Sequence, residues 1–269
     1  MIINTLGHLA FVLKVEQQEI KTIIGNIDKF YYEQEKIKVN KKGKVKRRVL
    51  NPSVRRLKVI QKRILENIFS QLQLPDYAYG AVTGRDNVRN AKKHQGKKYN
   101  FTTDLKKFFP SINHKKVFEM FRSFNFSPAV SRALTQLTTY KGKLPQGAPT
   151  SPITSNLVFI KTGKKLEQFA IENKLTFTTF IDDLTFSAPI DFKEKAAFII
   201  DTIQADGFRI SNDKTNYKTK NPMVTGVVVK NNNLALPDSF KIKLQNLNSK
   251  TEEQKRGLQL YANKVLNAN

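Results

Sequence analysis

The sequence predicts an α+β fold in which helices surround one sheet. Residues 16–32 place apolar side chains at the spacing of an amphipathic helix. Residues 176–181 and 184–188 are rich in Thr and Phe, which favour strands. A chain of 269 residues with 39% hydrophobic content can bury a sizeable core, and its length is typical of roughly one to two domains.

The N-terminal third predicts two helices and a basic hairpin. The first helix is expected from the spacing of Ile20, Ile23, Ile24, Ile27 and Tyr31. Residues 36–52, with Lys42-Gly43 at their centre, predict a basic β-hairpin, although a solvated charge run is the alternative. From Ser53 to Leu72, apolar spacing predicts a second, strongly basic helix that ends before Pro75.

Helices and strands alternate through the rest of the chain. The expected elements are a strand in 98–112 with Asp104 toward its end and a turn at Pro110, helices at 117–126 and 128–137, a Gly/Pro-rich loop at 141–152, a helix of about twenty residues from Ile153, the two strands around Asp182-Asp183, a helix over 192–208 that ends at Gly207, a buried strand at 223–229, and two short C-terminal helices.

The charge balance is the strongest global signal. The chain has 47 Lys and Arg residues against 22 Asp and Glu residues, a formal net charge of +25. Such a balance is typical of nucleic-acid binding proteins. The chain has no run of 18 apolar residues and its start lacks the features of a signal peptide, so we expect a soluble, cytoplasmic protein without a membrane partner.

The composition also restricts the kind of metal site. The chain has no Cys and three His, which excludes disulfides and thiolate sites and argues against a His cluster. Any bound metal must therefore use oxygen ligands, which indicates magnesium or manganese.

Asp182 and Asp183 stand side by side in the tight turn of a predicted hairpin. Two carboxylates about 4 Å apart repel by roughly 4 kcal/mol at an effective dielectric near 20. Water offsets this repulsion at an ordinary polar hairpin tip, and that is the simpler interpretation. The alternative is a divalent cation. With Asp104, these residues can hold two divalent ions about 3.5 to 4 Å apart, the arrangement used in phosphoryl transfer.

Five segments, FTTDLKKFFPSI, LPQGAPTSPITSN, FIDDLTFS, GFRISNDKT and VTG, occur in the order of reverse transcriptase palm motifs. Asn90-Ala-Lys-Lys-His94 and Val224-Thr225-Gly226 match the Asn-Ala-x-x-His and Val-Thr-Gly signatures of one variety. The chain resembles bacterial retron reverse transcriptases from its first helix to about residue 266.

The resemblance implies a right-hand polymerase fold. Residues 1–98 would be fingers with an N-terminal helix and the basic hairpin, 99–229 a palm with an antiparallel sheet and helices, and 230–269 a short helical thumb. It implies that Asp104, Asp182 and Asp183 are catalytic metal ligands, with the backbone carbonyl of Leu105 as a further ligand. The expected cofactors are two Mg²⁺ ions, with Mn²⁺ as a substitute.

Nucleotide-binding residues follow from the same resemblance. Arg47, with Lys41 or Lys42, would grip the triphosphate, and Phe109 would exclude ribonucleotides, although Phe109 is also suited to packing beside Phe108.

Three more residues belong to this expected set. Gln146 and Gly147 would lie against nucleotide and template, Gly147 because backbone must approach closely there. Lys214 would protonate the leaving pyrophosphate, although a turn lysine is commonly just solvated.

The two signatures, with the terminal basic helix, are expected to contact RNA. Asn90 and His94 lie four residues apart, on one face if the segment is helical, and a local hydrogen-bonding pair is the simpler interpretation. Val224, Thr225 and Gly226 would position the RNA, with a β-bulge as the alternative. Arg256 and Lys264 would act in the thumb.

The resemblance implies an RNA-directed DNA polymerase that uses deoxynucleotides to copy a cognate noncoding RNA. It would prime from a 2′-hydroxyl, leave RNA-linked DNA (msDNA), and serve antiphage defence with a separate effector protein. A group II intron or diversity-generating reverse transcriptase, and a non-catalytic RNA-binding protein of the same fold, are the alternatives. Phe180-Ile181 departs from the usual Tyr-Ala before the paired aspartates, which puts primer contacts, fidelity and speed in question.

Overall fold

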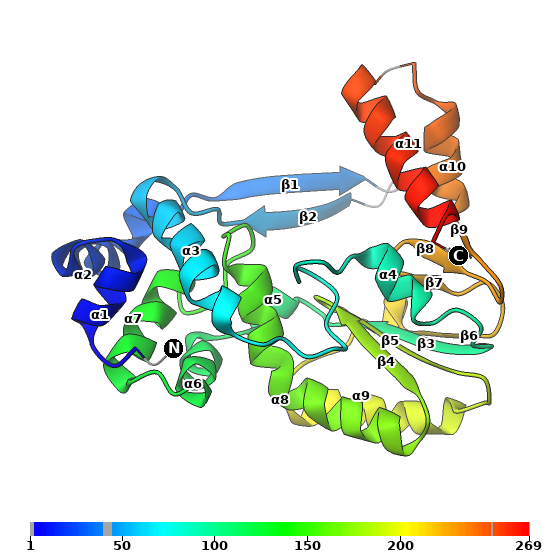
Figure 1. Ribbon diagram of the computed structural model, residues 1–269, viewed down its shortest axis with the longest axis horizontal. Helices are drawn as coiled ribbons and strands as arrows, with labels where there is room; N and C mark the ends of the chain where they lie inside the picture. Colours follow the sequence, from blue (N-terminus) through cyan, green and yellow to red (C-terminus); the bar gives the residue numbers. More distant parts are fainter. Residues whose placement is uncertain (1–2, 40–44, 249, 269) are drawn as a thin grey trace. The chain divides into compact units, whose positions relative to one another are not determined.

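The computed structural model describes residues 3–39, 45–248 and 250–268 (Figure 1). The chain divides into two units, one of residues 1–74 and 107–160 and the other of residues 75–106 and 161–269. Helix α8, Ser151–Glu172, contributes residues to both. The division into fingers, palm and thumb at residues 98 and 229 stays a prediction.

The first unit consists mainly of helices. Its helices before residue 75 are α1 (Leu6–Leu13), α2 (Gln17–Gly25), the 3₁₀ turn η1 (Ile27–Phe30), α3 (Arg55–Asn67) and the 3₁₀ turn η2 (Phe69–Gln71). The single helix expected over 16–32 was wrong at Asn26, where α2 ends and η1 follows. No expectation covered α1. In α3 the predicted apolar stripe is buried, with Leu57, Ile60 and Ile64 fully enclosed.

The basic hairpin is confirmed at its strands. β1 (Gln34–Val39) pairs antiparallel with β2 (Val45–Leu50), so that Gln34 lies opposite Leu50. The expected turn residues, Lys41 and Lys42 included, lie outside the described residues.

Three further helices complete this unit. They are α5 (Phe108–Ser111), α6 (His114–Ser123) and α7 (Pro128–Thr138). The turn expected at Pro110 was wrong, because that proline lies within α5. α6 and α7 begin at capping side chains: Asn113 accepts from the Lys116 N–H and Ser127 from the Val130 N–H.

The second unit is built on a four-stranded antiparallel sheet. Its strands are β3 (Tyr99–Asp104), β4 (Thr176–Phe180), β5 (Asp183–Ala188) and β6 (Asn216–Lys218), in the order β4-β5-β3-β6. Helix α9, Ala196–Ala205, runs alongside the C-terminal part of α8 (Figure 1). The rings of Phe169 and Phe198 stack between these helices with centroids 4.2 Å apart. Residues 216–218 had not been expected to form a strand.

A smaller sheet lies in the same unit, with α4 (Asn87–Lys92), α10 (Asp238–Gln245) and α11 (Glu252–Leu266) around it (Figure 1). Its strands are β7 (Met223–Val224), β8 (Val227–Val229) and β9 (Leu234–Ala235). The single strand expected over 223–229 was wrong, because Thr225 and Gly226 turn the chain with φ of 45° and 83°. Val88 and Ala91 of α4 share a buried core with this sheet and with Val265 of α11.

No helix in the described parts of the chain combines the length and apolar character that a membrane crossing requires.

Candidate active site

The backbone of the second unit brings the three predicted aspartates to one end of its larger sheet. Asp104 is the last residue of β3 and lies directly opposite Asp183, the first residue of β5. Asp182 sits in the preceding tight turn, and its carbonyl oxygen accepts a hydrogen bond of 2.8 Å from the Leu105 N–H. Motifs about eighty residues apart therefore meet through strand pairing, and directly opposed residues of this kind have side chains close enough to interact.

The negative charges of Asp182 and Asp104 act on the Asp183 carboxyl. Burial, and then the negative charges of Asp182 and Asp104, raise the pKa of Asp183 to about 6, against a smaller opposing effect of Lys214. Like charges directly opposite each other destabilise a sheet. The protein therefore maintains a charge arrangement that weakens its fold, which is characteristic of functional sites.

Asp104 is buried and its two carboxylate oxygens have different partners. Oδ1 accepts a hydrogen bond of 2.8 Å from the Ser211 hydroxyl, and Oδ2 forms an ion pair with the Lys214 ammonium. The Ser211 N–H also donates to the Asp104 carbonyl at 2.8 Å. Lys214 was predicted as a site residue, whereas Ser211 was missed, although it lies within the quoted GFRISNDKT motif.

As the structure positions them, the three carboxylates do not form a complete metal-binding site. Within the described ranges, no three His, Asp or Glu side chains are grouped closely enough to hold a metal ion. The donor chemistry nevertheless fits a divalent cation, because the negative charges of Asp182 and Asp104 raise the pKa of Asp183 and the positive charge of Lys214 offsets this effect only in part. Lys214 supplies at Asp104 the positive charge that a cation would supply.

The turn that carries Asp182 is strained. Ile181 has a φ of 59°, a region that is unusual for a β-branched residue. Such a conformation costs about 1–3 kcal/mol and persists only where the surrounding structure enforces it. Gly80 is part of that enforcement, because a Cβ added there would come within 2.7 Å of both the Ile181 backbone nitrogen and its Cγ1.

His94 joins α4 to the larger sheet. Its ring is fully buried, with Nδ1 2.6 Å from the Ser187 hydroxyl on β5 and Nε2 2.8 Å from the Thr178 hydroxyl on β4. These are the two strands of the hairpin that carries the paired aspartates. Because Asn90 and His94 are both buried, any contribution to RNA binding would act through the residues that they position.

The other face of α4 holds the Val-Thr-Gly turn. The Asn87 side chain donates to the Thr225 carbonyl at 3.1 Å, and the Asn90 side chain donates to the Thr225 hydroxyl at 3.3 Å. The Thr225 hydroxyl in turn donates to the Asn87 carbonyl at 3.2 Å. The two signatures are therefore one hydrogen-bonded structure. Asn87 was missed, and the only sequence signal for it is its place after Asp86, the residue that caps α4.

His94 should make stability depend on pH. Burial, and then the charge of Lys97, lower the pKa of His94 from 6.5 to about 3, so its folded form binds fewer protons than the unfolded chain between these values. The free energy of unfolding should therefore fall as pH drops below 6.5, by up to about 1.4 kcal/mol per pH unit from this group. Urea unfolding at pH 7, 6 and 5 checks this.

The matched control is His94→Gln, which keeps a polar side chain without a titrating ring. This variant should have a lower free energy of unfolding at pH 7, and its free energy of unfolding should depend less on pH than that of the wild-type protein. An unchanged slope in the variant would contradict this assignment of the titrating group.

Apart from Lys214, which lies in the second unit, the expected nucleotide-binding residues that the structure describes lie in the first unit. Arg47 on β2 is exposed and lies 3.7 Å from a carboxylate oxygen of Glu35 on β1. The Asn51 N–H donates to the Gln146 carbonyl at 2.6 Å. Gly147 has a φ of 107°, which favours glycine, and an added Cβ would lie 3.4 Å from Pro52, whereas its expected approach to nucleotide and template stays a prediction.

The proposed steric gate is also in this unit. Phe109 is partly buried, and its ring centroid lies 6.0 Å from that of Phe108. Lys42 lies outside the described residues. Arg256 is exposed on α11 in the second unit, whereas Lys264 of the same helix pairs with Asp86 at 2.9 Å.

Residues 39–233 match the family described as reverse transcriptase (RNA-dependent DNA polymerase). The chain is 32% identical over 233 residues to the Retron Ec86 reverse transcriptase of Escherichia coli, an alignment covering 85% of this chain and 72% of the relative. It is 33% identical over 194 residues to the Retron Se72 reverse transcriptase of Salmonella heidelberg, covering 72% of this chain and 50% of the relative.

A third similar protein is the Retron Mx162 reverse transcriptase of Myxococcus xanthus, 32% identical over 223 residues, with coverage of 71% and 46%. The chain thus spans about half the length of the Se72 and Mx162 relatives and 72% of the Ec86 relative.

Proposed function

We propose a reaction for this chain, which belongs to the reverse transcriptase family of RNA-directed DNA polymerases and, within it, to the retron reverse transcriptases. It copies a cognate structured noncoding RNA into single-stranded DNA that stays linked to the RNA. The observation that carries the proposal is the pairing of Asp104 with Asp183 beside Asp182, three acids at the end of one sheet.

Reverse transcriptases use divalent metal ions, and the ions proposed here are two Mg²⁺, with Mn²⁺ as a substitute. Asp104, Asp182 and Asp183 would hold them, with the Leu105 carbonyl as a further ligand. When bound, the ions would stabilise the attacking and leaving oxygens of nucleotidyl transfer. Ser211 fixes one oxygen of Asp104, which restricts the rotation of that carboxylate.

The residues of the first unit would hold the incoming deoxynucleotide. The guanidinium of Arg47 suits triphosphate oxygens, because its fork can donate two parallel hydrogen bonds. Lys42 would add a second cation. Gln146 and Gly147 would lie against the base pair that forms, and the ring of Phe109 would exclude a ribose 2′-hydroxyl.

Lys214 would act at the leaving group. Its ammonium is a proton source in the second unit, and the ion pair with Asp104 holds it beside the aspartates. We propose that it donates a proton toward the departing pyrophosphate.

The second unit would also hold the RNA. The half-buried Thr225 and the exposed Gly226 form a turn that Asn87 and Asn90 of α4 hold by hydrogen bonds, and the apolar Val224 anchors this turn in the core. Arg256 would contact RNA phosphates from α11. In the expected division, Val224, Thr225 and Gly226 belong to the palm of residues 99–229 and Arg256 to the thumb of residues 230–269, whereas Asn87 and Asn90 belong to the fingers of residues 1–98.

The wider role proposed is antiphage defence together with a separate effector protein. Synthesis would begin at a 2′-hydroxyl of the noncoding RNA, which produces the branched RNA-linked DNA (msDNA). The support for this role is membership of the retron family.

The test is to sequence the nucleic acid that copurifies with the protein, before and after incubation with deoxynucleotides and Mg²⁺. We expect one dominant structured RNA, and new DNA that remains attached to it after protease treatment and loses its RNA part on ribonuclease treatment. Free DNA without a linkage would contradict the retron mode, and no DNA synthesis on any primed RNA would contradict polymerase function.

A further inference from the structure

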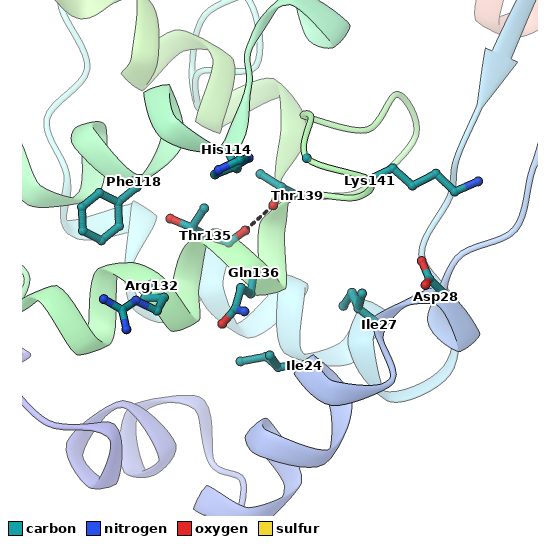
Figure 2. Close-up of a pocket in the computed structure, with 11 residues that line it drawn as sticks. Ile24, Ile27, Asp28, His114, Phe118, Arg132, Thr135, Gln136, Thr139 and Lys141 are labelled. Carbon is teal, nitrogen blue, oxygen red and sulfur yellow. Dashed lines mark hydrogen bonds between the residues drawn. The ribbon is translucent and has the colours of Figure 1, made fainter.

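A groove of about 670 Å³ lies in the first unit, formed by α2 with η1, α6, α7 and the turn that follows α7 (Figure 2). None of the residues expected for catalysis or nucleotide binding lines it. Its volume is within the range of small-ligand sites, about 300 to 1,000 Å³. Ile24, Ile27 and Phe118 supply apolar surface, whereas His114, Arg132 and Lys141 supply basic groups.

The groove is built from ordered contacts. His114 and Phe118 lie four residues apart on α6 and so share one face of that helix, and Arg132 and Gln136 do the same on α7. The turn after α7 is closed by two hydrogen bonds between Tyr140 and Lys143, of 2.8 and 3.0 Å. The same turn is tied to α6 because the His114 N–H donates to the Gly142 carbonyl at 2.9 Å.

The charge of the groove favours an anionic ligand. Arg132 and Lys141 lie toward opposite ends of it, with His114 and Gln136 between them (Figure 2). Asp28 is the one carboxylate among its lining residues. Among the described residues neither Arg132 nor Lys141 forms an ion pair, and the Lys141 ammonium lies 5.2 Å from the centroid of the Tyr140 ring, so no carboxylate neutralises either cation.

We propose that this groove binds an unstacked nucleotide of single-stranded RNA, as a second RNA site apart from the aspartates. Single-stranded RNA is recognised by bases that stack on aromatic rings and by cations that bind the flanking phosphates. Phe118 and His114 supply rings, Gln136 supplies an amide for a base edge, and Arg132 and Lys141 lie toward opposite ends for the phosphates. An acidic protein segment could form ion pairs with Arg132 and Lys141, but its carboxylates would not stack on the rings of Phe118 and His114. The inference rests on the proposed RNA-binding function.

The first test measures binding of a short fluorescein-labelled single-stranded RNA at several salt concentrations. On a single strand each lost phosphate contact should reduce the slope of log K against log salt concentration by about 0.7, so Arg132→Gln with Lys141→Gln should reduce it by about 1.4 and weaken binding about tenfold. The matched control is Lys58→Gln with Lys62→Gln, which removes the same charge from exposed positions on α3 of this unit. Equal slopes in the two double variants would overturn the proposal.

The second test locates the base. RNA that carries 4-thiouridine should crosslink under ultraviolet light to the peptide that contains Phe118, and Phe118→Leu should weaken binding about tenfold by loss of stacking. A crosslink map that omits α6 and α7 would overturn the proposal and leave an acidic protein segment as the ligand to test.

Extension of a DNA primer already annealed to an RNA template separates the two proposals. The groove variants should extend it at the wild-type rate. If the wild-type protein extends nothing but the groove variants still lose RNA affinity, the polymerase proposal fails and the groove proposal stands.

Discussion

An Asp183→Asn variant is expected to lose RNA-templated DNA synthesis while its fold becomes no less stable. Loss of a group that stabilises transition-state charge costs roughly a hundredfold to a thousandfold in rate, and a metal ligand should reach at least the upper value. The melting temperature should stay the same or rise, because burial and the negative charges of Asp182 and Asp104 disfavour the ionised carboxylate that the variant removes. Single-turnover primer extension and thermal unfolding measure the two effects.

The control for this variant is Asp201→Asn, an exposed acid on α9 of the same unit. It should change neither the extension rate nor the melting temperature by more than surface substitutions usually do. An Asp183→Asn protein that extends primers at the wild-type rate would refute a catalytic role for this carboxylate. A large loss of stability would mean that the side chain instead holds the fold together.

The second large effect is expected at Gly80. Its Cα lies so close to the catalytic turn that an alanine methyl group would overlap the Ile181 backbone nitrogen. The preceding segment cannot easily withdraw, because the Tyr79 N–H donates to the Thr179 carbonyl and the Thr179 N–H to the Tyr77 carbonyl, at 2.8 and 2.7 Å. Gly80→Ala should therefore displace the turn and Asp182, lowering stability by about 1–3 kcal/mol and extension by about a hundredfold.

Gly257→Ala is the matched control for the same change in the same unit. Gly257 lies inside α11, where an added Cβ meets nothing within 4 Å. Alanine is the better helix former, so this variant should gain about 0.5–1 kcal/mol of stability and keep full extension activity. Urea unfolding and primer extension compare the pair. Equal behaviour of the two variants would show that Gly80 does not constrain the turn.

Much of the site could be predicted because strand ends and motif order carry information that survives in a single sequence. Asp104 ends a strand of Thr and Phe residues, and Asp183 begins another, so both strands could be predicted from local sequence, although no local rule gives their pairing across about eighty residues. The strands of the basic hairpin were predicted for the same reason. The charge indicated a nucleic-acid binding protein, and the order of the motifs indicated a reverse transcriptase, which the family match confirms.

The missed contacts have a common physical cause. Ser211 bonds to Asp104 from 107 residues away, and Asn87 bonds to Thr225 from 138 residues away, so no local pattern indicates either pair. The turn at Thr225 was hidden because threonine favours strands and rarely adopts positive φ. Tertiary hydrogen bonds from α4 override that preference.

The strain at Ile181 was hidden in the same way. Two-residue hairpin turns favour glycine or asparagine at positive φ, so an isoleucine gives no turn signal of its own. Its position in the turn depends on contact with Gly80, which lies about a hundred residues earlier in the chain. The Phe180-Ile181 departure from the usual Tyr-Ala thus coincides with the strained residue of the site.

Binding of Mn²⁺, followed by electron paramagnetic resonance, tests the three-aspartate site most directly. The protein would be mixed with primer annealed to an RNA template and a non-hydrolysable deoxynucleotide. We predict that the wild-type complex removes about two ions per protein from solution and that Asp104→Asn and Asp182→Asn each bind fewer, without loss of RNA binding. Equal Mn²⁺ binding by all three proteins would contradict the account, since the ions would then lie elsewhere.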